Sequence, residues 1–488
     1  MMGRRSGRGP DAGEREPMPS TSRPAALTAG ILALAVVLTG CATTQVAGQA
    51  SPAGPPITDV APADFPITGA AETEADVTSR NALADLVDYW TQVFPEVYGE
   101  DFAPLTGGYF SVDPGDVDPS AYPDGEIGCG ADPADVEQNA FYCPPDTGEA
   151  TADSISYDRD FLQELGDTYG RFLPALIMAH EFGHAVQGRV GYPADDTSIN
   201  VETQADCFAG AWTRWVADGN SSHETIRAPE LDDLLAGYSI VRDPPGTGVD
   251  DSRAHGSYFD RVSAIQDGYD GGAAACRDNY GSDRVFTQSE FLSDQDLAND
   301  GNAPPAETAR LVQTALPIYF EDSFPEDLGT DFSAPTIEPF DGDAPGCLAP
   351  DAAVGFCADD DTVYYDATDL AGPAYTEIGD YAVLTAVAIP YGLAARAQLG
   401  LSTDDQDAIR SATCQAGAFS GAALYGEVVR GEDGIQLSPG DFDEAVTFLL
   451  TYGTDPTVFP EVGLSGFQLV DVFRQGFLYG LTSCGLEA

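Results

Sequence analysis

Apolar side chains recur every three to four residues between residues 171 and 190, which is the spacing of one face of an α-helix. Residues 202–210 show a second helical pattern, and another helical pattern begins near Asn81. Residues 154–158, Ser-Ile-Ser-Tyr-Asp, fit a short strand placed just before the helix at 171–190. Turn-rich segments separate these elements. The pattern predicts a helix-rich α+β fold.

The helix predicted at residues 171–190 contains the sequence His-Glu-Phe-Gly-His. His180 and His184 are four residues apart, so they project from one face and can grip one Zn²⁺. The same pattern also arises by chance on solvated helices. Here the flanks are apolar, and the pair uses two of only four histidines in the chain. We therefore predict a zinc site.

A catalytic zinc site takes three ligands from the protein and leaves the fourth position for water, so one more ligand is needed. Glu202 is the candidate, because it lies in a second helical stretch that can turn back onto the first. Asp206 shares its face and is predicted to accept the free ring N–H of a ligating histidine. Cys207 is rejected as a ligand, because it points roughly 100° away around the helix.

Three segments carry a resemblance to one bacterial family. They are HEFGHAVQ at residues 180–187, QADCFAG at 204–210, and His-Gly-Ser at 255–257 with Arg261. Over approximately residues 85–285 the chain resembles the putative neutral zinc metallopeptidases. More distantly, its ligand pattern is similar to that of the thermolysin-type zincins, which have a glutamate ligand. The resemblance implies a zincin-like fold and a zinc-dependent peptidase that acts on a peptide or protein.

The predicted site also indicates a mechanism. Zinc held by its three ligands lowers the pKa of bound water and polarises the scissile carbonyl. Glu181, next to a ligand but turned off the metal, takes the proton of that water and passes it to the leaving amine. We expect His255 to donate to the tetrahedral oxyanion, with Tyr258 as the second choice. The alternative for His255 is a structural histidine hydrogen-bonded at a turn.

The negative charge of the chain limits the classes of partner that we expect it to bind. Its 488 residues include 80 acidic and 21 basic side chains, and the formal net charge is −59. Such a surface repels nucleic acid and anionic membranes, so neither is expected to bind it directly. We interpret the charge as a solubilising shell. The length and the hydrophobic content of 43% suit two domains.

The N-terminus has the features of a targeting segment. Residues 25–38 are apolar, too few to span a bilayer comfortably, and follow Arg23. The sequence Leu-Thr-Gly-Cys ending at Cys41 resembles a bacterial lipobox. We predict a lipoprotein signal peptide at residues 1–40, a lipid on Cys41, and export to the outer face of the cell membrane. An uncleaved anchor, a different cleavage site, and a translation start at Met18 are the alternatives.

Composition also divides the rest of the chain. Residues 41–80 are rich in Ala, Pro, Thr and Gly and are predicted to form a flexible tether. The zinc metallopeptidase domain is expected over residues 81–298. Asn, Asp, Gly and Pro then cluster between residues 299 and 305 and predict a linker. Residues 306–488 form the second predicted domain.

The second domain has the sequence features of a tandem copy of the first. Four segments return in the same order: residues 94–102 at 324–332, 129–143 at 347–357, 205–211 at 412–418, and 266–276 at 474–484.

The copy has lost the predicted ligands. Ile389, Pro390 and Leu393 stand where the first domain has its two histidines and the glutamate between them. Ile409 and Thr413 stand in place of the two later carboxylates. We expect a degenerate, metal-free repeat that acts as a scaffold, with substrate or partner binding as the less favoured role.

Nine cysteines less a lipidated Cys41 leave eight, and an even number in an exported chain predicts disulfides. The repeat selects one pairing among the many that eight cysteines allow. The predicted pairs are Cys129 with Cys143, Cys207 with Cys276, Cys347 with Cys357, and Cys414 with Cys484.

Three functions are compatible with these features. The first is an exported, lipid-anchored metallopeptidase. The second is a non-catalytic metal-binding surface lipoprotein acting in protein interaction, in which Glu181 would have no use. The third is a zinc amidase of the cell wall, because the same constellation can hydrolyse a different amide. We favour the peptidase.

Overall fold

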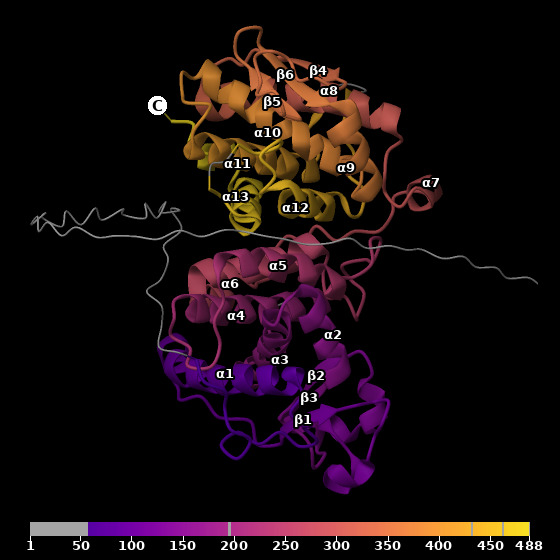
Figure 1. The fold of residues 1–488 in the computed structure, drawn as a ribbon, viewed down its shortest axis with the longest axis vertical. Coiled ribbons are helices and arrows are strands. Elements are labelled where there is room, and N and C mark those ends of the chain that lie inside the picture. The colour runs from indigo at the N-terminus through magenta and orange to yellow at the C-terminus, as the bar shows by residue number, and fades with distance from the viewer. Residues whose placement is uncertain (1–56, 194–196, 431–432, 461–462, 488) are drawn as a thin grey trace, which may run out of the picture. The chain divides into compact units, whose positions relative to one another are not determined.

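The computed structural model describes residues 57–193, 197–430, 433–460 and 463–487. The predicted signal peptide, Cys41 and the first part of the predicted tether lie outside the described residues. We call residues 57–298 the N-terminal half and residues 305–487 the C-terminal half. Each half combines a small sheet with several helices (Figure 1). The fold is therefore α+β and helix-rich, as predicted.

The described helices fall into two series along the chain. Those of the N-terminal half are α1 (Glu74–Tyr98), α2 (Arg159–Tyr169), α3 (Phe172–Val190), α4 (Ser198–Ala217), α5 (Ala228–Tyr238), α6 (Tyr258–Asp278) and α7 (Asp294–Ala298). Those of the C-terminal half are α8 (Pro305–Ser323), α9 (Gly372–Glu377), α10 (Asp380–Gln398), α11 (Gln406–Leu424), α12 (Asp441–Tyr452) and α13 (Gly466–Tyr479). Residues 299–304, between α7 and α8, form neither helix nor strand.

Each half contains one three-stranded sheet with the same topology. In the N-terminal half, β1 (Gly108–Val112) pairs in parallel with β3 (Ser154–Asp158), and β2 (Ala140–Cys143) pairs antiparallel with β3. In the C-terminal half, β4 (Thr336–Phe340), β6 (Thr362–Asp366) and β5 (Val354–Cys357) repeat this order and these directions. A short hairpin of β7 (Val429–Arg430) and β8 (Asp433–Gly434) is additional.

Helices α4 and α6 pack backbone against backbone. A Cβ atom added to Gly210 would lie 1.9 Å from the carbonyl oxygen of Ile265, and one added to Gly268 would lie 1.8 Å from that of Cys207. Only glycine fits at such separations. The Cys207–Cys276 disulfide joins the same two helices. This contact fixes α4, the helix that carries Glu202 and Asp206.

The C-terminal half reproduces that crossing. A Cβ atom on Gly417 of α11 would lie 1.8 Å from the carbonyl oxygen of Phe473 in α13, and one on Gly476 would lie 1.8 Å from that of Cys414. All four predicted disulfides are present in the structure, and each lies within one half.

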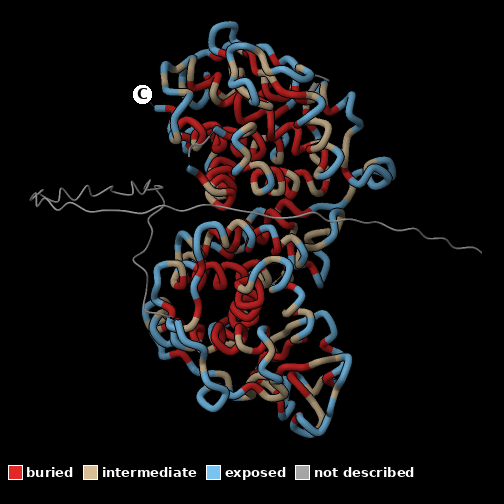
Figure 2. Tube along the Cα trace, in the orientation of Figure 1, coloured by how far each residue is buried: buried red, intermediate tan, exposed pale blue. Residues whose placement is uncertain are grey.

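Aromatic side chains in the core are also arranged alike in the two halves. Phe102 packs between Phe94 and Phe182, with ring centroids 5.4 and 5.6 Å away. In the C-terminal half, Phe332 packs between Phe324 and Tyr391 at 4.9 and 5.8 Å. Figure 2 shows buried positions concentrated in the central helices of each half. These correspondences agree with the predicted tandem repeat, and we keep the duplication as an interpretation.

The predicted tether is corrected for its second part. Helix α1 begins at Glu74, not near Asn81, and residues before it bond to the folded unit. The side-chain amide of Asn81 donates to Asp59 at 3.0 Å, and Arg80 forms an ion pair with Glu72. The folded part therefore includes residues from 57 onward. Within the part of the chain that the structure describes, no helix is long and apolar enough to cross a membrane.

Candidate metal centre

Helix α3 carries the His-Glu-x-x-His segment through the interior of the N-terminal half. Its residues from Phe172 to Gly183 are all buried, so the motif lies on a core helix and not on a solvent-exposed one. His180 is 6% exposed and Glu181 is 7% exposed. The helix ends at Gly191, whose positive φ of 91° is unfavourable for other residues.

Helix α4 approaches α3 closely beside the motif. A Cβ atom on Gly183 would lie 2.9 Å from the Cα atom and the carbonyl oxygen of Ala205. The glycine between the two histidines therefore lets the second helix come near enough for its carboxylates to reach them. Glu202 and Asp206, one turn apart on α4, both face α3 as predicted from their spacing.

Three side-chain atoms converge at this crossing. The Nε2 atoms of His180 and His184 are 3.1 Å apart. Glu202 Oε2 lies 3.2 Å from the first nitrogen and 3.4 Å from the second. A tetrahedral zinc ion with bonds of about 2.0–2.1 Å separates its ligand atoms by about 3.3 Å. The three distances match three corners of that tetrahedron.

The tautomer of His180 is set by Asp206. Its Nδ1 atom lies 2.7 Å from Asp206 Oδ1, which can only accept a hydrogen bond when ionised. The proton therefore sits on Nδ1, and the Nε2 lone pair faces Glu202 and His184.

Gln187 sets the tautomer of His184. The amide nitrogen of Gln187 donates to the carbonyl oxygen of Val201 at 2.7 Å, so its amide oxygen must face the other way. That oxygen lies 2.8 Å from His184 Nδ1 and accepts its proton. Both histidines therefore direct an Nε2 lone pair at the same point, alongside a carboxylate oxygen. Only a cation satisfies three such acceptors together, so the donor set fits zinc.

Asp206 is held in turn by a buried network. Arg261 of α6 donates to both of its carboxylate oxygens at 2.9 Å, and the hydroxyl of Tyr238 donates to Oδ1. Asp206 is 0% and Arg261 is 3% exposed. Burial alone would raise the pKa of Asp206, but Arg261 and His180 outweigh it and hold the pKa below its ordinary value.

The electrostatics of the centre favour a cation. Burial would lower the pKa of His180, yet Asp206 and Glu202 outweigh it and raise that pKa to about 10. Protons therefore compete with a metal ion for Nε2. Burial would raise the pKa of Glu202, but the two histidines hold it well below its ordinary value. Glu181 differs, because burial raises its pKa and the neighbouring histidines only partly oppose this.

Comparison with known proteins places this centre in a family. Residues 1–280, more than half of the chain, match the family described as "Putative neutral zinc metallopeptidase". The chain belongs to this family. Membership implies Zn²⁺ as the cofactor, in agreement with the donor set at the helix crossing.

Curated relatives share part of the sequence. The chain is 30% identical over 173 residues to the uncharacterized protein Rv2575 of Mycobacterium tuberculosis (strain ATCC 25618 / H37Rv). The matched region covers 30% of this chain and 57% of that protein. It is 31% identical over 176 residues to the uncharacterized protein YpfJ of Escherichia coli (strain K12), covering 32% and 58%. The chain thus spans less than two thirds of the relatives it matches. No solved structure matches the chain.

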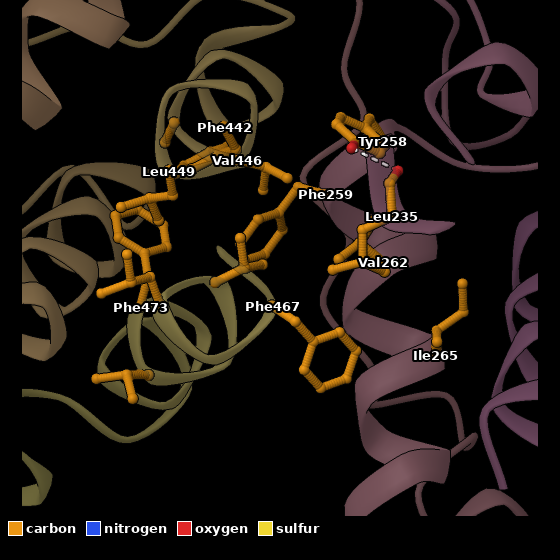
Figure 3. Close-up of a cluster of buried hydrophobic side chains, with 14 of the residues drawn as sticks. Leu235, Tyr258, Phe259, Val262, Ile265, Phe442, Val446, Leu449, Phe467 and Phe473 are labelled. Carbon is orange, nitrogen blue, oxygen red and sulfur yellow. Dashed lines mark hydrogen bonds between the residues drawn. The ribbon is translucent and has the colours of Figure 1, made fainter. Parts of the chain in front are cut away.

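The two candidates for the oxyanion donor have other polar partners in the structure. The side chain of His255 is 49% exposed, and its Nδ1 atom lies 3.5 Å from Asp243 Oδ1. Among the described residues, the ion pair of His255 is with Asp243 and not with Glu202. The hydroxyl of Tyr258 is buried and donates to the carbonyl oxygen of Leu235 at 2.6 Å (Figure 3), so it is not available to a substrate. Tyr258 is thus excluded, and the role of His255 stays a prediction.

Sequence reasoning missed two residues of the centre. Gln187 lies three residues after His184 and belongs to the family-like segment, so its place one turn along α3 was a usable signal. Tyr238 lies on α5, 32 positions from Asp206, and no local spacing connects them. The role of Arg261 was also missed, although the residue was part of the resemblance.

Proposed function

We propose that this chain is an exported, lipid-anchored, zinc-dependent peptidase in which His180, His184 and Glu202 bind the metal ion. The convergence of their three acceptor atoms, at 3.1–3.4 Å from one another, carries the proposal. The adjacent, buried Glu181 is the feature that favours hydrolysis over metal storage, because storage has no use for a carboxylate there.

The residues of the centre divide the chemical work. His180, His184 and Glu202 would hold a zinc ion, and the chemistry it would supply is Lewis acidity towards a carbonyl and a bound water. Glu181 takes up the proton released by the attacking water and delivers it to the leaving amine. Burial raises its pKa, which brings its proton affinity nearer to neutral pH and suits it to both steps.

Other residues keep the ligands in position. Asp206 and Gln187 each accept the Nδ1 proton of one histidine, which orients the ring and keeps Nε2 free for the metal. Arg261 and Tyr238 hold Asp206 in turn. His255 remains our candidate for stabilising the oxyanion, although in the structure it contacts Asp243.

Export and anchoring are proposed from the sequence alone. The apolar segment at residues 25–38 and the lipobox-like sequence ending at Cys41 support them. The four disulfides are compatible with an oxidising compartment. Labelling with a radioactive fatty acid, in wild type and Cys41→Ser, tests the anchor. Label in the first protein only is the expected result.

The decisive experiment compares wild type with Glu181→Gln, both purified from Cys41 onward. We expect one zinc ion per chain in both proteins and hydrolysis of casein by the wild type alone. Isolated peptidoglycan serves as the second substrate, because its hydrolysis without that of casein would indicate an amidase. Bound zinc without hydrolysis of either substrate would indicate a metal-binding protein. Absence of zinc from both proteins would remove the ligand assignment.

A further inference from the structure

Helices α6 and α13 have the same construction. Ser257 and Ser465 cap their first turns, each accepting a hydrogen bond from the backbone N–H three residues later. Near their other ends, Gly272 and Gly480 have almost the same dihedral angles, with φ of 66° and 72° and ψ of −175° and −174°. Both pairs are separated by 208 positions, so adding 208 to a residue number in α6 gives its counterpart in α13.

The two helices meet through two aromatic contacts that are equivalent to each other when the halves are exchanged. Phe259 of α6 packs on Phe477 of α13, with ring centroids 4.8 Å apart and an interplanar angle of 63°. Tyr269 of α6 packs on Phe467 of α13 at 4.9 Å and 64°. By the rule of 208, Phe467 is the counterpart of Phe259, and Phe477 is the counterpart of Tyr269. Each contact therefore repeats the other with the halves exchanged.

Two carboxylates make equivalent contacts with the first turns of these helices, each from the opposite half. The backbone N–H of Phe259 donates to Asp443 of α12 at 2.9 Å. The backbone N–H of its counterpart Phe467 donates to Asp232 of α5 at 2.7 Å. In each case the second residue of one helix is capped by a carboxylate from the other half, on the helix that precedes α6 or α13 along the chain.

The contact between the halves is well buried. Phe259 is 2%, Phe467 is 5% and Phe477 is 8% exposed. Figure 3 shows Phe259 extending from α6 between α12 and α13, and Phe467 extending from α13 towards α6. At the edge of this surface Arg474 forms an ion pair with Asp267 at 2.5 Å.

In a two-fold symmetric interface, residue i of one partner contacts residue j of the other, and j contacts i. The paired aromatic contacts and the paired caps obey this rule within a single chain. We propose that the C-terminal half occupies the place of a second subunit: the face of α5 and α6 is the surface through which a unit of this fold pairs with its own copy, and this chain carries that copy covalently.

This pairing gives a role to a half that lacks counterparts of the three zinc ligands. The interface residue Phe259 lies two positions before Arg261, which contacts Asp206. Pairing therefore supports the helix behind the zinc ligands, whether or not the copy has ligands of its own. It does not depend on the peptidase activity proposed above.

The test uses the whole chain with a protease recognition sequence inserted between Asn299 and Asp300, both of which are exposed. All four disulfides lie within one half, so cleavage leaves no covalent bond between the halves. Sedimentation velocity over a dilution series then measures the dissociation constant of the two fragments. We expect a one-to-one complex that persists at low micromolar concentration.

Matched variants test the symmetry. Tyr269→Ala and Phe477→Ala remove counterpart rings, so each should weaken the cleaved complex by a similar factor of about 30. Asp232→Ala and Asp443→Ala remove the two cap acceptors and form a second matched pair, for use if a ring variant fails to fold; each should also weaken the cleaved complex by a similar factor. Tyr425→Ala, at a side chain that is 61% exposed, is the control and should leave the constant unchanged. Separation of the wild-type fragments, or effects within a matched pair that differ more than tenfold, would overturn the proposal.

Discussion

The crossing of α3 with α4 and the crossing of α10 with α11 share a backbone arrangement but differ in chemistry. Gly183 packs on Ala205 in the first crossing, and Gly392 packs on Ala412 in the second. A Cβ atom added to either glycine would lie 2.9 Å from the Cα atom of the facing alanine. The first crossing holds two histidines, two acidic side chains and an arginine from α6. At the corresponding positions of the second crossing, only apolar side chains and a threonine are found.

The comparison distinguishes the packing of the two helices, which we call the frame, from the side chains that could bind metal. The second crossing packs equally closely although it lacks the predicted ligands, so this packing does not require those side chains. Its Ile389 and Ile409 are 5% and 2% exposed, which places apolar groups where the first crossing has a ligand nitrogen and a ligand oxygen. We therefore expect the N-terminal frame to fold without its metal-binding side chains.

The largest effect is expected from transferring residues of the second crossing into the first. His180→Ile with His184→Leu and Glu202→Ile should abolish stoichiometric zinc binding and bring hydrolysis below detection. The free energy of unfolding, measured with chelator present, should change by no more than about 2 kcal/mol, because buried polar groups are often replaced by apolar ones at little cost. Metal analysis, peptide assays and urea denaturation test this. A variant that fails to fold would show that the frame needs its ligands.

The next effect concerns the pair Asp206 and Arg261, whose counterparts are Thr413 and Leu469. Asp206→Thr alone leaves a buried guanidinium without its carboxylate and should lower the free energy of unfolding by about 3–5 kcal/mol. Adding Arg261→Leu should recover part of that loss. Chemical denaturation of both single variants and the double variant measures the coupling. Additive effects would show that the two side chains are energetically independent.

A smaller effect should appear in the pH dependence of stability at the contact between the halves. Burial raises the pKa of Asp443 to about 6, although Arg242 and the N–H of Phe259 oppose it. Because the folded value exceeds the ordinary value of 3.8, the protonated carboxyl stabilises the fold at low pH, and this contribution is lost as the pH rises through 6.

Asp443→Asn should remove that dependence. Between pH 4 and pH 7 the wild type should lose up to about 3 kcal/mol of stability relative to the variant, since one pKa unit corresponds to about 1.4 kcal/mol. Urea denaturation at several pH values gives both curves. Parallel curves would contradict the assignment, because a parallel pair means that the folded state does not change the proton affinity of Asp443.

The smallest effect is expected at Gln187, which orients only one ligand. Gln187→Met keeps the volume but removes the acceptor for His184 Nδ1, so zinc affinity should fall by about tenfold. Competition with a chromogenic chelator measures the affinity. Gln163→Met, on α2 outside the centre, is the matched control. Unchanged affinity in Gln187→Met would mean that the ring of His184 is oriented by the metal alone.

Local spacing was enough to predict much of the centre. The two histidines lie one turn apart on one helix, with Glu181 beside the first, and Glu202 and Asp206 lie one turn apart on another. In the structure His180, His184 and Glu202 contact one another, and Asp206 contacts His180. The disulfide pairing followed from the repeat, because four cysteines occur in the same order in each half. Both inferences depend on short distances along the chain or on self-comparison.

Other features depend on contacts that no spacing encodes. Helix α1 begins earlier than predicted because its first turns bury polar groups, so an apolar period is absent. Asp76, for instance, accepts hydrogen bonds from Ser111 and Tyr157 at 2.6 and 2.9 Å. Tyr238 reaches Asp206 from a separate helix. These interactions become visible only once the chain is folded.

The glycine contacts between α4 and α6 have a practical use for tracing ancestry. In both halves a cysteine precedes the first glycine by three positions, at Cys207 and Gly210 and at Cys414 and Gly417. The second glycine of each half precedes the partner cysteine by eight positions, as with Gly268 and Cys276. Because no larger side chain fits at these points, we expect the pattern to be kept even where the predicted zinc ligands are replaced. A genome search with this pattern, and without any histidine, would recover inactive descendants that a search for the zinc motif passes over.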